Sequence, residues 1–169
     1  MGYVHDTSIS RFIQAIECLY SAGTWTHTVA SNLWTMVRTA ADASFTIMIP
    51  VQAPLQSSVA LKGAYLKTVD IWYVVATGAL DAAAATMYKM TLAADGAACT
   101  TAEVVKTYDT GHDAAAERID VDEHKMTLTV TTPFWVDDDE VVYVELVVDA
   151  AATSAFSLIG ARANFTLRI

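Results

Sequence analysis

Apolar and polar residues alternate with a period of two through much of the chain, and this pattern constrains the fold more than any other feature. Residues 125–130 read KMTLTV, so that three apolar side chains share one face and three polar ones share the other. Successive side chains of a β-strand point to opposite faces, whereas an amphipathic helix repeats every three or four residues. The segment is therefore predicted to be a half-buried antiparallel strand.

The C-terminal segment 157–169 shows the longest alternation. Ser157, Ala161 and Phe165 belong to one row, and Arg162 and Asn164 belong to the other. Because the arginines point away from the apolar row, we expect this strand to have one wet side.

Further strands are predicted where β-branched and aromatic residues lie between turn signals. Their ranges are 25–29, 33–40, 44–51, 63–76 and 140–149. The segment 63–76 carries bulk on both faces, including Trp72, which predicts burial on two sides. Residues 11–20 fit either a helix or a strand, and we favour a strand; Thr100 and Glu103 resemble a capping box, which makes a short helix over 101–106 possible.

Together these segments predict an all-β chain: a single antiparallel β-sandwich, jelly-roll-like, with eight or nine strands. Residues 1–21 are expected to form an N-terminal strand or arm, and residues 22–169 the sandwich. The length of 169 residues fits one domain, and no composition shift divides it.

Charge and hydropathy limit the partners. The chain is 54% hydrophobic and only 17% charged, with a net charge of −9, which argues against disorder and against a nucleic-acid partner. Apolar stretches are too short to predict a membrane span, and the first ten residues lack the basic region of a signal peptide. So few charges on the surface favour burial against copies of the same chain, although Thr and Ser could cover the remainder.

Catalytic and metal motifs are weak, and we expect a protein that is not an enzyme and has no cofactor. No Gly-x-Ser-x-Gly elbow and no glycine-rich phosphate loop occurs. His112 and His124 bracket an acidic stretch, for which a solvated loop is the simpler interpretation. Asp137, Asp138 and Asp139 are a weak calcium candidate, because they lack the spaced ligands and glycine of an EF-hand and suit an ordinary turn.

Aromatic residues suggest the alternative function, a carbohydrate-binding β-sandwich module. Trp25, Trp34, Trp72 and Trp135 would stack on sugars if they were exposed, but core packing is the favoured interpretation for them. Asn164 begins an Asn-x-Thr sequon and is a possible glycosylation site. The two cysteines, Cys18 and Cys99, are expected to be buried free thiols.

Three stretches, AGTWT at 22–26, KGAYLKTVDIWY at 62–73 and GARANF at 160–165, resemble small all-β virion structural proteins of phage and environmental viral genomes. The resemblance implies a jelly-roll-like subunit that self-associates or decorates a particle, and it supplies no catalytic residues. The main hypothesis is therefore a non-enzymatic subunit of a virion or extracellular filament, with copies of itself, other virion proteins or glycans as partners. The candidate assembly segment is the apolar N-terminal arm, whose residues are Ile9, Phe12, Ile13, Ile16, Leu19 and Tyr20.

Overall fold

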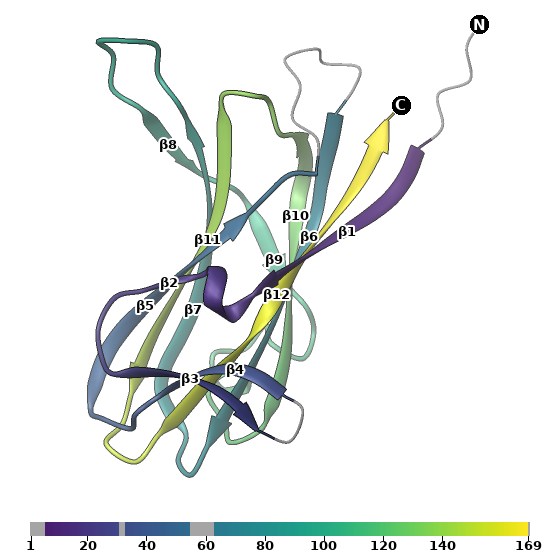
Figure 1. Ribbon diagram of the computed structural model, residues 1–169. Coiled ribbons are helices and arrows are strands. Elements are labelled where there is room, and N and C mark those ends of the chain that lie inside the picture. Colours follow the sequence, from purple (N-terminus) through teal and green to yellow (C-terminus); the bar gives the residue numbers. More distant parts are fainter. Residues whose placement is uncertain (1–5, 31–32, 55–62, 169) are drawn as a thin grey trace, which may run out of the picture.

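Two antiparallel sheets packed face to face account for the strands of the protein (Figure 1). The computed structural model describes residues 6–30, 33–54 and 63–168. Sheet A contains β1 (Asp6–Gln14), β3 (Trp25–Ala30), β4 (Leu33–Arg38), β6 (Gly63–Ala76), β9 (Lys106–Tyr108), β10 (Glu123–Trp135) and β12 (Ala155–Arg168). Sheet B contains β2 (Leu19–Tyr20), β5 (Ala43–Val51), β7 (Leu80–Thr91), β8 (Thr100–Glu103) and β11 (Glu140–Ala150).

The strand order confirms the jelly-roll-like sandwich. Sheet A runs β3-β4-β12-β6-β10-β9, with β1 also pairing with β12, and sheet B runs β2-β5-β11-β7-β8. Strands β4 to β7 pass alternately from one sheet to the other, and β10, β11 and β12 return between them in the same way. With β8, which pairs with β7, these eight strands make the two four-stranded halves of a jelly roll, β4-β12-β6-β10 and β5-β11-β7-β8, while the remaining strands extend the edges. The described residues contain twelve strands, more than the eight or nine that were predicted.

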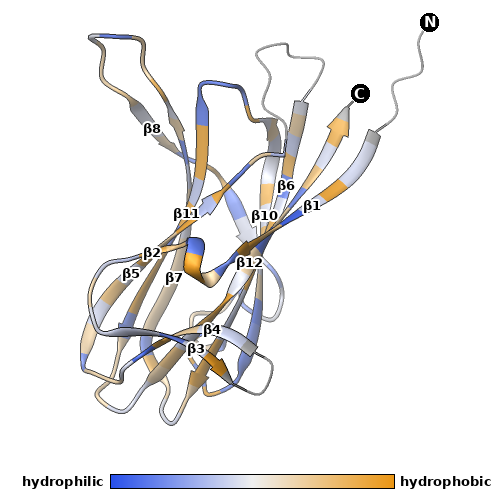
Figure 2. Cartoon of the chain, viewed as in Figure 1, coloured by the Kyte–Doolittle hydropathy of each residue, from blue (hydrophilic) through white to orange (hydrophobic). Residues whose placement is uncertain are grey.

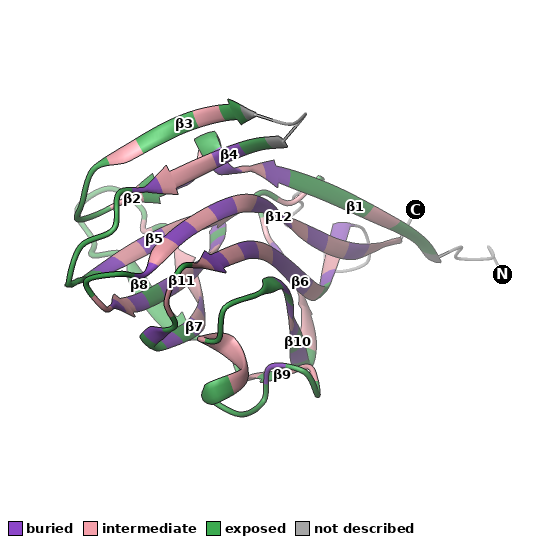
Figure 3. Cartoon of the chain, turned by 90° about the horizontal axis from the view of Figure 1, so that it is seen from below, coloured by how far each residue is buried: buried purple, intermediate pink, exposed green. Residues whose placement is uncertain are grey.

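The core lies between the sheets, and the alternation of the sequence places it there (Figures 2 and 3). On β11, Val142, Val144, Leu146 and Val148 are buried while the residues between them are exposed or half-buried. On β10, Met126, Leu128 and Val130 are buried as the sequence predicts. Each large aliphatic side chain buried in this way contributes about 1.5–3 kcal/mol.

Two β-bulges correct the predicted faces of the longest strands. The register shifts between Leu158 and Gly160 on β12, so that Leu158 is buried together with Ala161 rather than opposite it. A second shift beside Lys67 on β6 buries both Leu66 and Val69. A bulge inserts one extra residue, so the inward parity of the strand changes on either side of it.

The N-terminal segment is part of the sandwich rather than separate from it. Strand β1 pairs along its whole length with β12, from Asp6 opposite Arg168 to Gln14 opposite Gly160. A single 3₁₀ turn, η1 (Ala15–Glu17), then carries the chain to β2 at the edge of sheet B. Most of 11–20 is therefore strand, with one helical turn where the two predicted patterns overlapped.

Two further expectations are wrong. Residues 100–103 form strand β8 instead of starting a helix, because they pair with the end of β7, Thr100 opposite Thr91. Cys99 is exposed, whereas Cys18 is buried as expected, and both are free.

A second 3₁₀ turn, η2 (Ala116–Arg118), lies in the loop before β10.

Candidate functional site

Trp72 lies on the outer face of sheet A, half-buried, and not in the core as the sequence suggested. Its inward neighbours on β6, Ile71 and Tyr73, are fully buried, so the strand alternation turns Trp72 to the outside. Lys125 of β10 is directly opposite on one side and Gly160 of β12 on the other.

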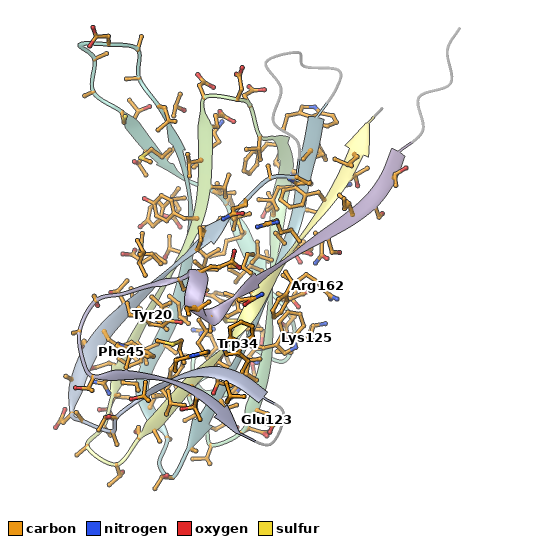
Figure 4. All side chains as sticks on the ribbon, in the orientation of Figure 1. Tyr20, Trp34, Phe45, Glu123, Lys125 and Arg162 are labelled. Carbon is orange, nitrogen blue, oxygen red and sulfur yellow. The ribbon has the colours of Figure 1, made fainter. Side chains whose placement is uncertain are left out.

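Cations lie against the tryptophan ring. The Cζ atom of Arg162 is 5.2 Å from the centroid of the Trp72 ring, and the Nζ atom of Lys125 is 5.9 Å from it. Figure 4 shows Arg162 and Lys125 near one another on the outer side of sheet A. Both distances are within the range of a cation–π interaction.

A buried carboxylate organises this face. Asp70 is 3% exposed, and its Oδ2 accepts hydrogen bonds from Arg162 Nε at 3.1 Å, Arg162 Nη2 at 2.7 Å and Asn164 Nδ2 at 3.1 Å. Its Oδ1 accepts a hydrogen bond from Thr127 Oγ1 at 2.7 Å. Arg162 and Thr127 are also the cross-strand partners of Asp70 on β12 and β10. The network therefore joins three neighbouring strands.

The charge of Asp70 is stabilised by these donors. Burial alone raises the pKa of Asp70, but the hydrogen bonds from Arg162, Thr127 and Asn164 and the charge of Lys125 outweigh it and leave the pKa below its ordinary value. Asp70 is thus a carboxylate that holds its neighbours in place. Asn164 Nδ2 also donates to Thr68 Oγ1 at 2.9 Å, and Ser10 Oγ donates to Asn164 Oδ1 at 2.7 Å, which extends the network to β1.

A second aromatic ring borders the tryptophan. Phe12 of β1 is 51% exposed, and its ring centroid is 6.4 Å from that of Trp72. Gly160 permits this approach: a Cβ atom there would lie 2.8 Å from Phe12 Cζ and 2.6 Å from the carbonyl oxygen of Ile13. A cleft of about 440 Å³ lies between β1 and the residues that follow β5; it is lined by Ile9, Ser10, Arg11, Phe12, Gln52, Ala53 and Pro54.

We call this surface the Trp72 platform, defined by the side chains of Ser10, Phe12, Asp70, Trp72, Lys125, Thr127, Arg162 and Asn164. It combines exposed aromatic surface with hydroxyl, amide and guanidinium groups that are fixed by mutual hydrogen bonds. Such a surface can stack a ring and hydrogen-bond its substituents.

The outer face of sheet B is different in chemistry. Tyr143 of β11 is directly opposite Tyr88 of β7, and their ring centroids are 5.4 Å apart. Burial and the nearby carboxylates of Glu145 and Glu103 raise the pKa of Tyr88. A cleft of about 340 Å³ on this face is lined by Glu17, Leu19, Met48, Pro50 and Tyr143.

The candidate assembly residues divide between core and surface. Ile13 is buried, whereas Phe12, Ile16 and Leu19 are 51%, 55% and 72% exposed. Ile9 and Tyr20 are half-buried, and Tyr20 packs against Trp25 with ring centroids 4.3 Å apart.

His112 and His124, which the sequence singled out, do come together. His112 Nε2 lies 3.3 Å from His124 Nδ1, and His112 Nδ1 lies 2.9 Å from Asp109 Oδ1. Both histidines are buried, and His124 stacks on Tyr73 with centroids 4.6 Å apart. These contacts anchor the loop before β10 to the core. Across the described ranges, no group of three or more His, Cys, Asp or Glu residues is arranged to hold a metal ion.

Asp137, Asp138 and Asp139 form the turn between β10 and β11. The backbone N–H of Glu140 donates to the carbonyl of Asp137 at 3.1 Å, which closes the turn. The Glu140 carboxylate also forms an ion pair with Lys89. The calcium prediction for this turn stays a prediction.

The other tryptophans lie elsewhere. Trp25 packs edge-on against Phe45 and Phe156, as expected for the core. Trp34 on β4 is 48% exposed and borders His27, while Trp135 packs against Tyr65 at the end of β10. The predicted glycosylation site, Asn164, lies within the Trp72 platform.

Sequence reasoning missed the platform because its residues come from four strands. One signal was present: Asp70 lies two residues before Trp72, and Asn164 two residues after Arg162, so each pair shares a face. An acidic residue and a tryptophan on one face of a hydrophobic strand indicate that this face is not simply core.

No protein-family model matches the chain, and no curated protein sequence is similar to it. Among solved structures, a family two carbohydrate esterase from Cellvibrio japonicus aligns over 98% of the chain and 36% of its own length, with 5% identity and a TM-score of 0.40. The module TmCBM61, solved with β-1,4-galactotriose, aligns over 96% of this chain and 88% of its own, with 10% identity and a TM-score of 0.32. The enzymatically active domain of a bacteriophage CBA120 tailspike protein aligns over 97% and 19%, with 7% identity and a TM-score of 0.34.

The chain thus spans about a third of the length of the esterase and a fifth of that of the tailspike domain. These structures are β-rich neighbours of low identity and low TM-score, and they carry no argument about function. In the part of the chain that is described, no helix is long and apolar enough to cross a membrane.

Proposed function

We propose that the protein is a non-catalytic carbohydrate-binding module and that a glycan stacks on the Trp72 platform. The observation that carries this proposal is the half-buried ring of Trp72, set among side chains that the buried carboxylate of Asp70 holds in place. Carbohydrate sites need an aromatic surface for the sugar ring and oriented polar groups for its hydroxyls, and the platform supplies both.

Preorganisation favours binding at this surface. Arg162, Asn164 and Thr127 are already hydrogen-bonded to Asp70, so a ligand does not have to order them. Immobilising side chains is an entropic cost of association. In this protein these side chains are already ordered in the folded state, so the cost on binding is smaller.

A binding role fits the platform better than catalysis. Hydrolysis of a glycoside normally uses two carboxyl groups on opposite sides of the bond. The central carboxylate here, Asp70, accepts four hydrogen bonds and is 3% exposed, so it is not presented to a substrate.

The test is a glycan array followed by calorimetry of the best oligosaccharide against matched tryptophan variants. Trp72→Ala should weaken binding about thirtyfold, which corresponds to the loss of about 2 kcal/mol at a central aromatic contact. Trp34→Ala removes an exposed tryptophan from β4, outside the Trp72 platform, and should bind like the wild type. Unchanged binding by a folded Trp72→Ala variant would refute the proposal, and so would an array with no retained glycan.

A second candidate, self-assembly as a structural subunit, is favoured by the outer face of sheet B. Leu19, Val147 and Val141 are 72%, 41% and 36% exposed there, and Leu19 lines the cleft at Tyr143. Covering exposed apolar side chains is a common role of protein–protein contacts. The same role would use β1, whose nine residues occupy an edge of sheet A next to β12.

Light scattering after size exclusion separates the two candidates. Assembly predicts a species larger than 18.2 kDa that a Leu19→Asp variant converts to the monomer. A wild-type monomer at high concentration would eliminate assembly through this face and leave the carbohydrate proposal intact.

A further inference from the structure

We infer that the sugar bound at the Trp72 platform is anionic, and that Arg162 and Lys125 hold its acidic group. The inference rests on the proposed carbohydrate-binding function and names the class of glycan. It follows from which hydrogen-bond donors of the platform are bonded within the protein and which remain free for a ligand.

Only one edge of the Arg162 guanidinium group is hydrogen-bonded to the described residues. Asp70 accepts hydrogen bonds from Nε and Nη2, which form one edge of the guanidinium group. The end edge, Nη1 with the second hydrogen of Nη2, has no partner among the described residues, and the side chain is 41% exposed. A guanidinium edge donates two parallel hydrogen bonds and matches a carboxylate or sulfate group in shape and charge.

Asp70 orients this arginine without blocking it. Both oxygens of Asp70 are occupied, Oδ1 by Thr127 and Oδ2 by Arg162 and Asn164. The carboxylate therefore fixes the direction of the guanidinium while the free edge faces solvent. An anionic ligand does not need to displace Asp70.

Lys125 adds a second positive charge on the other side of the platform. It is exposed, lies directly opposite Trp72 on β10, and forms no ion pair with any described residue. Glu123, the next outward residue along β10, is exposed and makes no ion pair with Lys125 or Arg162. A sugar ring stacked on Trp72 would thus have a cation beside it on β10 and another on β12.

The local charge runs against that of the whole chain. The net charge is −9, so long-range electrostatics repel a polyanion. The two cations beside the tryptophan ring therefore suit short-range recognition of single acidic groups, and not long-range attraction of a polyanion. The donor geometry fits the carboxylate of a uronic acid and the sulfate ester of a sulfated sugar, which share this chemistry.

The experiment compares each acidic oligosaccharide with its neutral counterpart. Oligomers of galacturonate, glucuronate, mannuronate and guluronate are titrated by calorimetry, and each is repeated after its carboxylates have been reduced to alcohols. Sulfated galactan oligosaccharides and their desulfated forms make a parallel arm. At least one acidic member should bind ten times more tightly than its neutral form, and Trp72→Ala should weaken that binding about thirtyfold, as for the carbohydrate-binding proposal itself.

Charge variants locate the contact. Lys125→Gln should weaken binding of the acidic form about fivefold, the equivalent of about 1 kcal/mol, and should weaken binding of the neutral form less. Lys106→Gln removes the same charge beside Tyr108 on β9 and should have no effect. Arg162→Lys keeps the charge next to Asp70 but loses the two-donor edge, and should lower the affinity for the acidic form further than Lys125→Gln.

The outcomes distinguish the inference from the function beneath it. Equal, Trp72-dependent binding of acidic and neutral forms would overturn the anionic inference and leave the carbohydrate-binding proposal standing. Absence of any Trp72-dependent binding would overturn both. Binding confined to sulfated members would support the anionic site and identify sulfate as its source.

Discussion

The two outer faces of the sandwich have similar strand architecture but opposite surface chemistry. On sheet A, the cross-strand row Arg162, Asp70 and Thr127 is polar and connected by hydrogen bonds, with Phe12 at its end. On sheet B, the row Pro50, Tyr143, Tyr88 and Glu103 is apolar, aromatic or acidic. The proposals assign the first face to a polar ligand and the second to contact with another copy of the chain.

The difference also separates two uses of an outward-facing position. Asp70 is buried although it points away from the core, because neighbours from the two flanking strands, β10 and β12, cover it. Val147 is 41% exposed at an equivalent outward position of β11. Burying the Asp70 carboxylate costs desolvation free energy and requires four hydrogen bonds to offset it. Fewer residue types can therefore replace Asp70 than can replace Val147, which only leaves an apolar group in water.

The largest expected effect comes from removing the carboxylate of sheet A. Asp70→Ala leaves Arg162, Asn164 and Thr127 without their shared acceptor, so we expect the free energy of unfolding to fall by about 3 kcal/mol. Glu145→Ala on the outer face of sheet B should cost less than about 0.5 kcal/mol. Urea denaturation of both variants measures the contrast, and equal losses would show that the two faces are alike in stability.

Gly160→Ala tests the seating of Phe12 on the same face. The added Cβ would lie 2.6 Å from the carbonyl oxygen of Ile13, and Gly160 has a φ of +153° that suits glycine. We expect a loss of about 2 kcal/mol, together with displacement of β1. Denaturation and hydrogen exchange of the β1 amides measure these effects; an unchanged stability would mean that β1 can shift at no cost.

Acid should act on sheet A through the same carboxylate. The pKa of folded Asp70 lies below its ordinary value, so its stabilising contribution is complete above about pH 4 and is lost as the pH falls through the folded pKa. The free energy of unfolding should therefore decrease more steeply below pH 4 in the wild type than in Asp70→Asn. Parallel pH profiles for the two proteins would contradict this assignment.

The smallest effect on stability is expected on sheet B. Val147→Thr exchanges an exposed methyl group for a hydroxyl and should change the free energy of unfolding by less than about 0.5 kcal/mol. If sheet B is an assembly surface, however, the same variant should dissociate more readily in sedimentation experiments. An unaltered sedimentation profile together with unaltered stability would mark the position as ordinary surface.

Most of the strands could be predicted from the sequence, but the platform could not. The alternation in 125–130 and 140–149 is local and survives in β10 and β11. The bulges at Lys67 and Gly160 change the inward parity, and no local pattern marks them. Trp72, Lys125 and Arg162 become neighbours through the register of three strands, which the tertiary fold fixes.

The same limit explains the interpretation of Trp72 as a core residue. Large residues on both faces of 63–76 are typical of a strand buried on two sides. Here the outward ring has Lys125 and Arg162 beside it instead of a further layer of protein. Trp72 is accordingly half-buried, and its outward neighbour Lys125 is exposed, so this face of the strand is surface and not a second core face.

The pairing of β1 with β12 has a consequence for how the molecule reaches its folded state. Because the first strand takes its place beside the last, Ile13 has no partner in sheet A until nearly the whole chain has left the ribosome. Contacts between residues far apart in the sequence make folding slow. Until β12 is in place, β1 is an unpaired strand with exposed apolar side chains. Two chains at this stage can exchange their first strands and still satisfy every β1–β12 pair, so conditions during synthesis, as well as final stability, would determine how much monomer is recovered.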